Sequence, residues 1–102
     1  FVEVKGVTLE EEGIAAFPDA PTERGVRHIE ELAHAGEEGF LVYILFVIQM
    51  KGISAFRPND RTHPQFGQAL RKAREKRVNI LAYDCIVAED SLELADPVRV
   101  EL

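Results

Sequence analysis

Residues 40–49, from Phe40 to Gln49, read FLVYILFVIQ and form the longest apolar run of the chain. An unbroken apolar run of this length is typical of a strand that is covered on both faces in an α/β protein. The run is too short for a membrane span, which needs roughly 20 residues. We therefore expect a buried central strand in a soluble protein with no membrane contact.

Helical periodicity is found on either side of this run. One helix is expected from about residue 22 to Ala35, capped by Asp19 or Thr22, and a second begins near His63-Pro64. Each has an apolar stripe with spacings of three and four residues, which is typical of a helix that covers a core. The stripes are Val26, Ile29, Leu32 and Ala33 in the first helix and Phe66, Ala69, Leu70 and Ala73 in the second.

Further strands are expected before and after the two helices. Residues 2–7 alternate with period two, and residues 78–87 form a second buried strand. Residues 14–17 fit a strand or an extended arm, residues 51–62 fit a loop, and short strands at 92–94 and 98–102 are separated at Asp96-Pro97. Because strands and helices alternate, crossovers should join parallel strands. We predict one α/β domain over residues 1–102, with a mixed central sheet sandwiched by flanking helices.

Charge and cysteine content limit the choice of partners and compartment. The net charge is −6, and phosphate neutralisation supplies most non-specific nucleic-acid affinity, so the domain as a whole is a poor polyanion binder. Five of the twelve basic residues nevertheless fall within residues 71–77. The single cysteine, Cys85, lies in an apolar run and is expected to be a buried thiol, which favours a cytoplasmic protein.

The pair Glu3 and Lys5 is the clearest candidate for chemistry. Residues two apart on a strand project to the same side, roughly 6 to 7 Å apart. A carboxylate in this position can bind Mg²⁺, and an ammonium can orient the attacking water and stabilise charge on a scissile phosphate. By itself such a pair also occurs on any solvated strand face.

Two longer stretches give this pair a context. The sequence FVEVKGVTL from Phe1 to Leu9, followed by FPDAPTERG from Phe17 to Gly25, closely resembles the sugar fermentation stimulation protein A family. The likeness continues at His28, Glu31 and Leu32, at residues 46–49 and, more loosely, at residues 69–83.

The resemblance implies a restriction-endonuclease-like fold similar to the PD-(D/E)xK nucleases, with an OB-like domain upstream in full-length members. It also implies that Glu3 and Lys5 are the catalytic E-x-K pair and that Glu3 binds Mg²⁺ or Mn²⁺. An aspartate on a preceding strand would complete the metal site. Because the chain starts at the E-x-K strand, we expect that aspartate upstream and the chain alone to be inactive.

Two main functions remain open, with a third of a more general kind. The first is Mg²⁺-dependent hydrolysis of phosphodiesters in DNA or RNA, with DNA as the expected partner. The second is a non-catalytic DNA-binding regulator of sugar metabolism. The third is an interaction domain in which the sheet only supports partners.

Five residues are candidate nucleic-acid contacts. Thr22 and Arg24 begin the first helix, whose free N–H groups favour anions, although helix capping explains Thr22 equally well. Arg71, Lys72 and Arg74 could clamp a phosphate backbone, or they could form a solvated helix face near a helix C-terminus.

Overall fold

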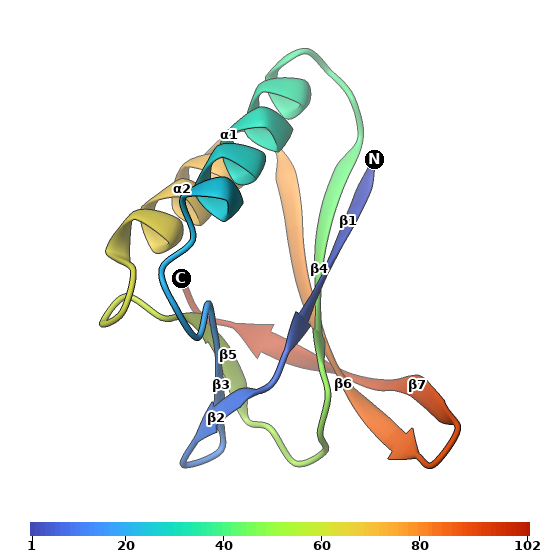
Figure 1. Cartoon of the computed structure of the whole chain (residues 1–102). Helices are drawn as coiled ribbons and strands as arrows, with labels where there is room; N and C mark the ends of the chain where they lie inside the picture. Colours follow the sequence, from blue (N-terminus) through green and yellow to red (C-terminus); the bar gives the residue numbers. More distant parts are fainter.

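The chain forms a seven-stranded mixed sheet with two helices in a computed structural model that describes all 102 residues (Figure 1). The strands are β1 Val2–Val7, β2 Leu9–Glu11, β3 Ile14–Phe17, β4 Val42–Ile48, β5 Ala55–Pro58, β6 Val78–Ala88 and β7 Ser91–Val100. The helices are α1 Glu23–Glu37 and α2 Pro64–Glu75, and the strand order is β1-β4-β6-β7-β5-β3-β2. The predicted mixed α/β fold is confirmed.

Both helices lie on one face of the sheet, whereas the sequence suggested helices on both faces (Figure 1). The strands β1, β4 and β6 are parallel and adjacent in that order. Two right-handed crossovers that step in the same direction place their helices on the same side. The opposite face therefore stays open, and Val2, Val4 and Leu81 are 66%, 56% and 40% exposed there.

Strand β7 joins the two halves of the sheet. It runs antiparallel to β6 and parallel to β5, with Phe56 opposite Val100. Two sequence predictions are wrong in this region, since residues 51–62 contain β5 and Asp96-Pro97 lies within β7 rather than between two strands. The ladder shifts register between Tyr83 and Cys85, and a proline is tolerated in a strand near such an irregularity.

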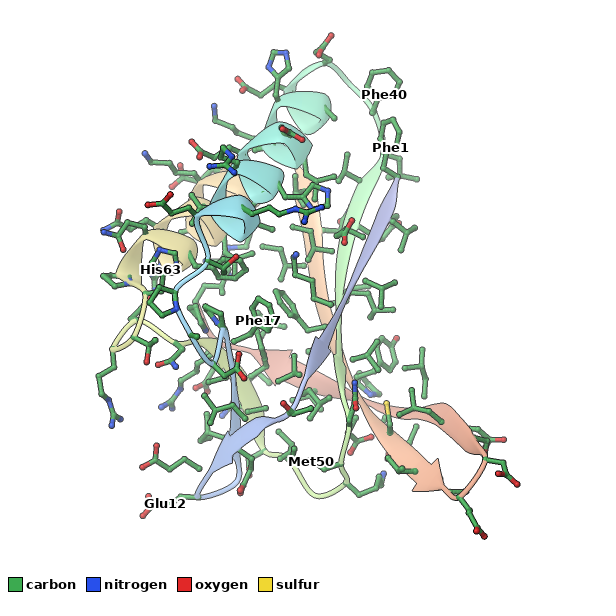
Figure 2. All side chains as sticks on the ribbon, in the orientation of Figure 1. Phe1, Glu12, Phe17, Phe40, Met50 and His63 are labelled. Carbon is green, nitrogen blue, oxygen red and sulfur yellow. The ribbon has the colours of Figure 1, made fainter.

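The core lies between the helices and the sheet. Ile29 and Ala33 of α1 and all four stripe residues of α2 are buried, while Val26 and Leu32 pack partly buried against them, as their spacing predicts. Phe46 stacks on Phe56 with ring centroids 4.3 Å apart. Phe17 lies between sheet and helices (Figure 2), and the free thiol of Cys85 is buried as expected.

The two helix starts are tied together. Thr22 rather than Asp19 caps α1, because its Oγ1 accepts the N–H of Gly25 at 2.9 Å. The backbone N–H of Thr22 donates to Nδ1 of His63, the residue that precedes Pro64 at the start of α2, at 3.1 Å. Neither helix is long and apolar enough to cross a membrane.

Candidate metal and nucleic-acid site

Glu3 and Lys5 project from β1 toward the face that carries the helices. In the parallel ladder Glu3 lies opposite Ile44 and Lys5 opposite Phe46, both of which are buried in the core under the helices. Residues that are opposite one another in a ladder share a face of the sheet, so the two charged side chains point the same way. Both are half-buried, because β1 is the edge strand. The shared face predicted for this pair is confirmed.

The carboxylate of Glu3 has a partner from α1. Its Oε2 lies 3.3 Å from Nε2 of His28, and the two side chains are 28% and 39% exposed. No pattern in the sequence predicts this contact. The position at which a helix crosses a strand depends on the packing of the whole layer and leaves no local signal.

Lys5 is held by an aromatic ring. Its Nζ lies 5.8 Å from the centroid of the Phe17 ring, within the range of a cation–π interaction. The Phe17 ring is itself fixed by contacts with Phe46 and Phe66, at centroid distances of 5.7 and 5.2 Å. The ammonium therefore lies near the Phe17 ring, on the sheet face that Lys5 shares with Glu3, and the Lys5 residue stays half-exposed.

The start of α1 brings one predicted cation to this region. Arg24 is exposed and lies four residues before His28, so the two side chains are neighbours on one face of the helix. Thr22 uses its hydroxyl to cap the helix and its N–H to bind His63. Arg24 is therefore the better placed of the two for a phosphate contact.

The basic residues of α2 lie on the other helix and are partly neutralised. Arg71 binds Asp60 at 2.6 Å, and Lys76 at the helix end binds Glu37 at 2.7 Å. Lys72 lines a groove between α1 and α2, and Arg74 is exposed. No ion pair or hydrogen bond joins Arg71, Lys72 or Arg74 to β1. The structure thus does not group these three residues with Glu3 and Lys5.

A broad groove of about 650 Å³ runs beside β2, β3 and β5. Asp19 lines this groove and also a smaller hollow next to Phe17. The charged groove residues are of both signs, namely Glu11, Glu12, Asp19, Arg57, Asp60 and Arg61. This mixture does not select an anionic ligand.

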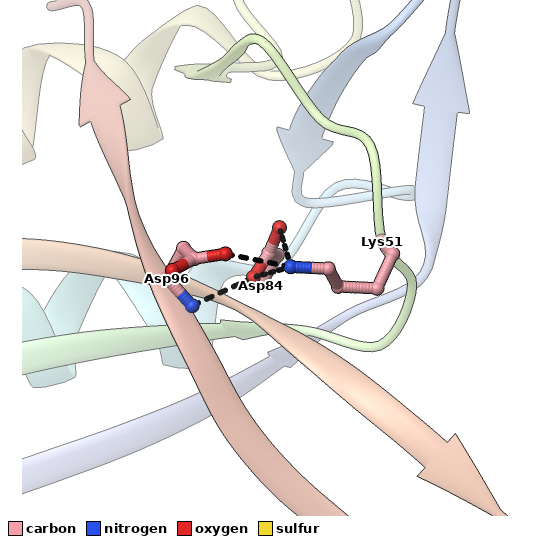
Figure 3. Close-up of polar contacts among 3 residues, drawn as sticks. All are labelled: Lys51, Asp84 and Asp96. Carbon is pink, nitrogen blue, oxygen red and sulfur yellow. Dashed lines mark hydrogen bonds and ion pairs between the residues drawn. The ribbon is translucent and has the colours of Figure 1, made fainter.

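A second polar constellation lies after the end of β4 (Figure 3). Lys51 Nζ is 2.7 Å from Asp96 and 3.4 Å from the buried Asp84, whose Oδ1 also accepts the backbone N–H of Asp96 at 2.9 Å. The hydrogen bond that Lys51 donates to Asp96, followed by its contacts with Asp84, raises the pKa of Lys51. This cluster ties the loop after β4 to β6 and β7. No group of three or more His, Cys, Asp or Glu side chains converges as metal ligands in the chain.

Comparison with known proteins places the domain. Residues 1–91 match the family described as the sugar fermentation stimulation protein RE domain. The chain belongs to this family. It is 60% identical to the sugar fermentation stimulation protein homolog of Desulfitobacterium hafniense (strain Y51) and 58% identical to that of Ruminiclostridium cellulolyticum, over all 102 residues in each case.

A solved structure of the family has the same fold. The chain superposes on Pyrococcus furiosus SfsA, whose structure was determined in complex with Ca²⁺, with a TM-score of 0.92 at 31% identity. All of this chain is covered, but only 45% of that protein. The chain likewise spans 45% of the Desulfitobacterium and Ruminiclostridium relatives. The restriction-endonuclease-like fold expected from the sequence is confirmed.

Proposed function

We propose that the full-length protein is a divalent-cation-dependent nuclease and that this chain supplies Glu3 and Lys5 to its active site. The observation that carries the proposal is the shared projection of these two side chains from an edge strand beside α1. Membership of a restriction-endonuclease-like family supports it. The Ca²⁺ complex of Pyrococcus furiosus SfsA also supports a divalent cation here, with Mg²⁺ or Mn²⁺ as the working ion.

The donor set suits such a cation. Mg²⁺ prefers oxygen ligands, and the Glu3 carboxylate is half-exposed and bound by no lysine or arginine. When bound, the cation supplies Lewis acidity that polarises a phosphoryl oxygen. Further ligands come, in this proposal, from the part of the protein outside this chain, including an aspartate on a strand before β1. We also propose an OB-like domain in that part.

Lys5 stabilises the negative charge that develops during hydrolysis. A water oxygen forms a bond to phosphorus, the bond from phosphorus to the leaving sugar oxygen breaks, and that oxygen takes up a proton while the attacking water loses one to solvent. Negative charge increases on the phosphoryl oxygens, and an ammonium fixed over Phe17 can donate hydrogen bonds to them. Fixed donors are effective because they need no reorganisation during the reaction.

Nucleic acid is the proposed substrate, and DNA the preferred one. Arg24 would contact the backbone next to the scissile bond, while Arg71, Lys72 and Arg74 of α2 would contact it farther away. The overall charge of −6 requires such local contacts, because the domain has no general attraction for phosphate.

The test is cleavage of labelled single- and double-stranded DNA and RNA by the full-length protein with Mg²⁺, Mn²⁺ or EDTA. We expect metal-dependent cleavage that falls at least about 100-fold in Lys5→Ala and in Glu3→Gln. Lys76→Ala is the matched control, since it removes the same charge from an exposed position at the end of α2. Unchanged cleavage in Lys5→Ala would contradict the site.

The same experiment distinguishes the alternative function. A non-catalytic DNA-binding regulator of sugar metabolism would bind DNA without cleaving it under any metal condition. In that case Arg24→Ala would weaken binding while Lys5→Ala would leave it nearly unchanged.

A further inference from the structure

We propose that His28 is a ligand of the same divalent cation as Glu3, so that the site binds transition-metal dications in preference to Mg²⁺ and Ca²⁺. The inference rests on the proposed function, because it takes Glu3 as a metal ligand. It adds a residue from α1 to a pair that lies entirely on β1.

Two observations together carry the inference, namely the distance between the two side chains and their partly buried place on the face that Glu3 shares with Lys5. Nε2 of His28 and Oε2 of Glu3 are 3.3 Å apart, longer than the roughly 2.7 to 2.9 Å of a charge-assisted N–H···O bond. Adjacent ligands of an octahedral ion at about 2.1 Å are themselves about 3 Å apart. The two atoms therefore already have nearly the separation that a shared cation requires.

The surroundings of His28 agree with this role. Its ring has no side-chain partner other than Glu3 among the chain's ion pairs and hydrogen bonds, so no other side chain of the chain competes with a cation for it. Both side chains are partly buried, and they come from β1 and α1, two elements that the fold brings together. The pair thus has a fixed geometry and access for an ion from solvent.

A second pair on the same helix provides a control. His34 Nε2 lies 3.0 Å from Glu38 Oε1, but these side chains are 73% and 56% exposed. They are also four residues apart on the free surface of one helix end, away from Lys5. Any cation binding there measures the affinity of a simple surface pair.

The chemistry of the donors predicts the metal preference. Imidazole is a good ligand for first-row transition ions, whereas Mg²⁺ and Ca²⁺ are bound by carboxylates, carbonyls and water. A site with one carboxylate and one imidazole should therefore distinguish Co²⁺ from Ca²⁺. Removal of the imidazole should reduce this distinction and leave the oxygen-based affinity.

The experiment is titration calorimetry of the full-length protein with Co²⁺ and with Ca²⁺, in the absence of nucleic acid. For His28→Gln we expect Co²⁺ affinity to fall at least about tenfold, the lower end of what even outer-shell partners of a metal contribute. Ca²⁺ affinity should change much less, and His34→Gln should change neither. His28→Glu should raise Ca²⁺ affinity because it adds a second carboxylate. Paramagnetic shifts of the His28 ring on addition of Co²⁺ provide a readout independent of affinity.

The outcomes separate the inference from the proposed function. If His28→Gln is folded and binds Co²⁺ as tightly as the parent, the inference is wrong. If Glu3→Gln also leaves Co²⁺ and Ca²⁺ binding unchanged, the metal role of Glu3 is wrong as well. Loss of Co²⁺ binding in both variants, in a protein that cleaves no nucleic acid, would support His28 as a ligand and contradict only the nuclease.

Discussion

The backbone N–H of Thr22 donates a hydrogen bond to Nδ1 of His63, so the residue that begins α2 also orders the residue that begins α1 (Figure 2 labels His63). His63 is buried and makes no side-chain cap for its own helix. The contact links the two helices at the end nearest Phe17. Since Phe17 supports Lys5, the contact also helps to hold the candidate site in shape.

Substitution of His63 tests this link. His63→Ala leaves the N–H of Thr22 without an acceptor, and we expect a loss of about 1–3 kcal/mol in the free energy of unfolding. His63→Asn keeps an acceptor near the position of Nδ1 and places a favoured capping residue before Pro64, so it should be at least as stable as the parent. Urea unfolding followed by circular dichroism measures both. Equal stability of the alanine variant and the parent would show that the hydrogen bond contributes nothing.

Gly36 allows the end of α1 to lie against the chain after α2. A Cβ at this position would be 2.5 Å from the carbonyl oxygen of Lys76, and backbone there cannot move aside cheaply. We expect Gly36→Ala to destabilise the fold by about 1–3 kcal/mol despite the better helix propensity of alanine. Thermal unfolding measures the effect. Gly6→Ala is the control, because its Cβ would meet only the flexible end of Gln49.

Asp84 should be the member of the Lys51 cluster on which stability depends. Asp84→Ala leaves the N–H of Asp96 unsatisfied at the irregular part of the β6–β7 ladder, at a cost of about 1–3 kcal/mol. Asp96→Ala removes a side chain that is 72% exposed and keeps that N–H bonded, so a change within about 0.5 kcal/mol is expected. The two variants are compared by urea unfolding. A larger loss in Asp96→Ala than in Asp84→Ala would contradict this order.

Glu101 should make the stability of the fold depend on pH in the acidic range. A hydrogen bond from Arg57, assisted by Arg99, holds the pKa of Glu101 below its usual 4.5. Its ionised form therefore stabilises the folded state fully above the ordinary pKa, and this contribution is lost as the pH falls through the lowered value. Glu101→Gln should be less stable than the parent near pH 7, and the difference should shrink as the pH falls below 4.5 and disappear only below the lowered pKa of Glu101. Unfolding curves between pH 3 and pH 7 test this, with Glu89→Gln as a control that removes one exposed carboxylate without an ion-pair partner.

The sequence predicted the features that depend only on the spacing of neighbouring residues. The stripes on α1 and α2 follow from helical spacing, and the shared face of Glu3 and Lys5 follows from strand alternation. Strand β5 was not predicted, because the segment Ala55–Pro58 is a strand only through its pairing with β3 and β7. The strand break expected at Asp96-Pro97 is absent for the same reason. Pro97 pairs with Tyr83 of β6, and the N–H of Asp96 binds Asp84 of β6, so β7 continues through both residues.

The residues of the candidate site were likewise only partly predictable from the sequence. Glu3 and Lys5 could be proposed from spacing and family resemblance, whereas their neighbours could not. His28 reaches Glu3 only because α1 packs across the sheet next to β1. Phe17 lies near Lys5 only because the fold brings the end of β3 against β1. Such contacts depend on tertiary packing, which no short segment encodes.

The position of β7 in the chain affects the order in which the sheet can form during synthesis. It is the only hydrogen-bonded connection between the β1-β4-β6 group and the β5-β3-β2 group, and it is the last strand of this chain to leave the ribosome. Until residues 91–100 emerge, a nascent chain can form two separate ladders but no continuous sheet. The two ladders can join only after residues 91–100 have been synthesised, because long-range strand pairs form only when both partners are available.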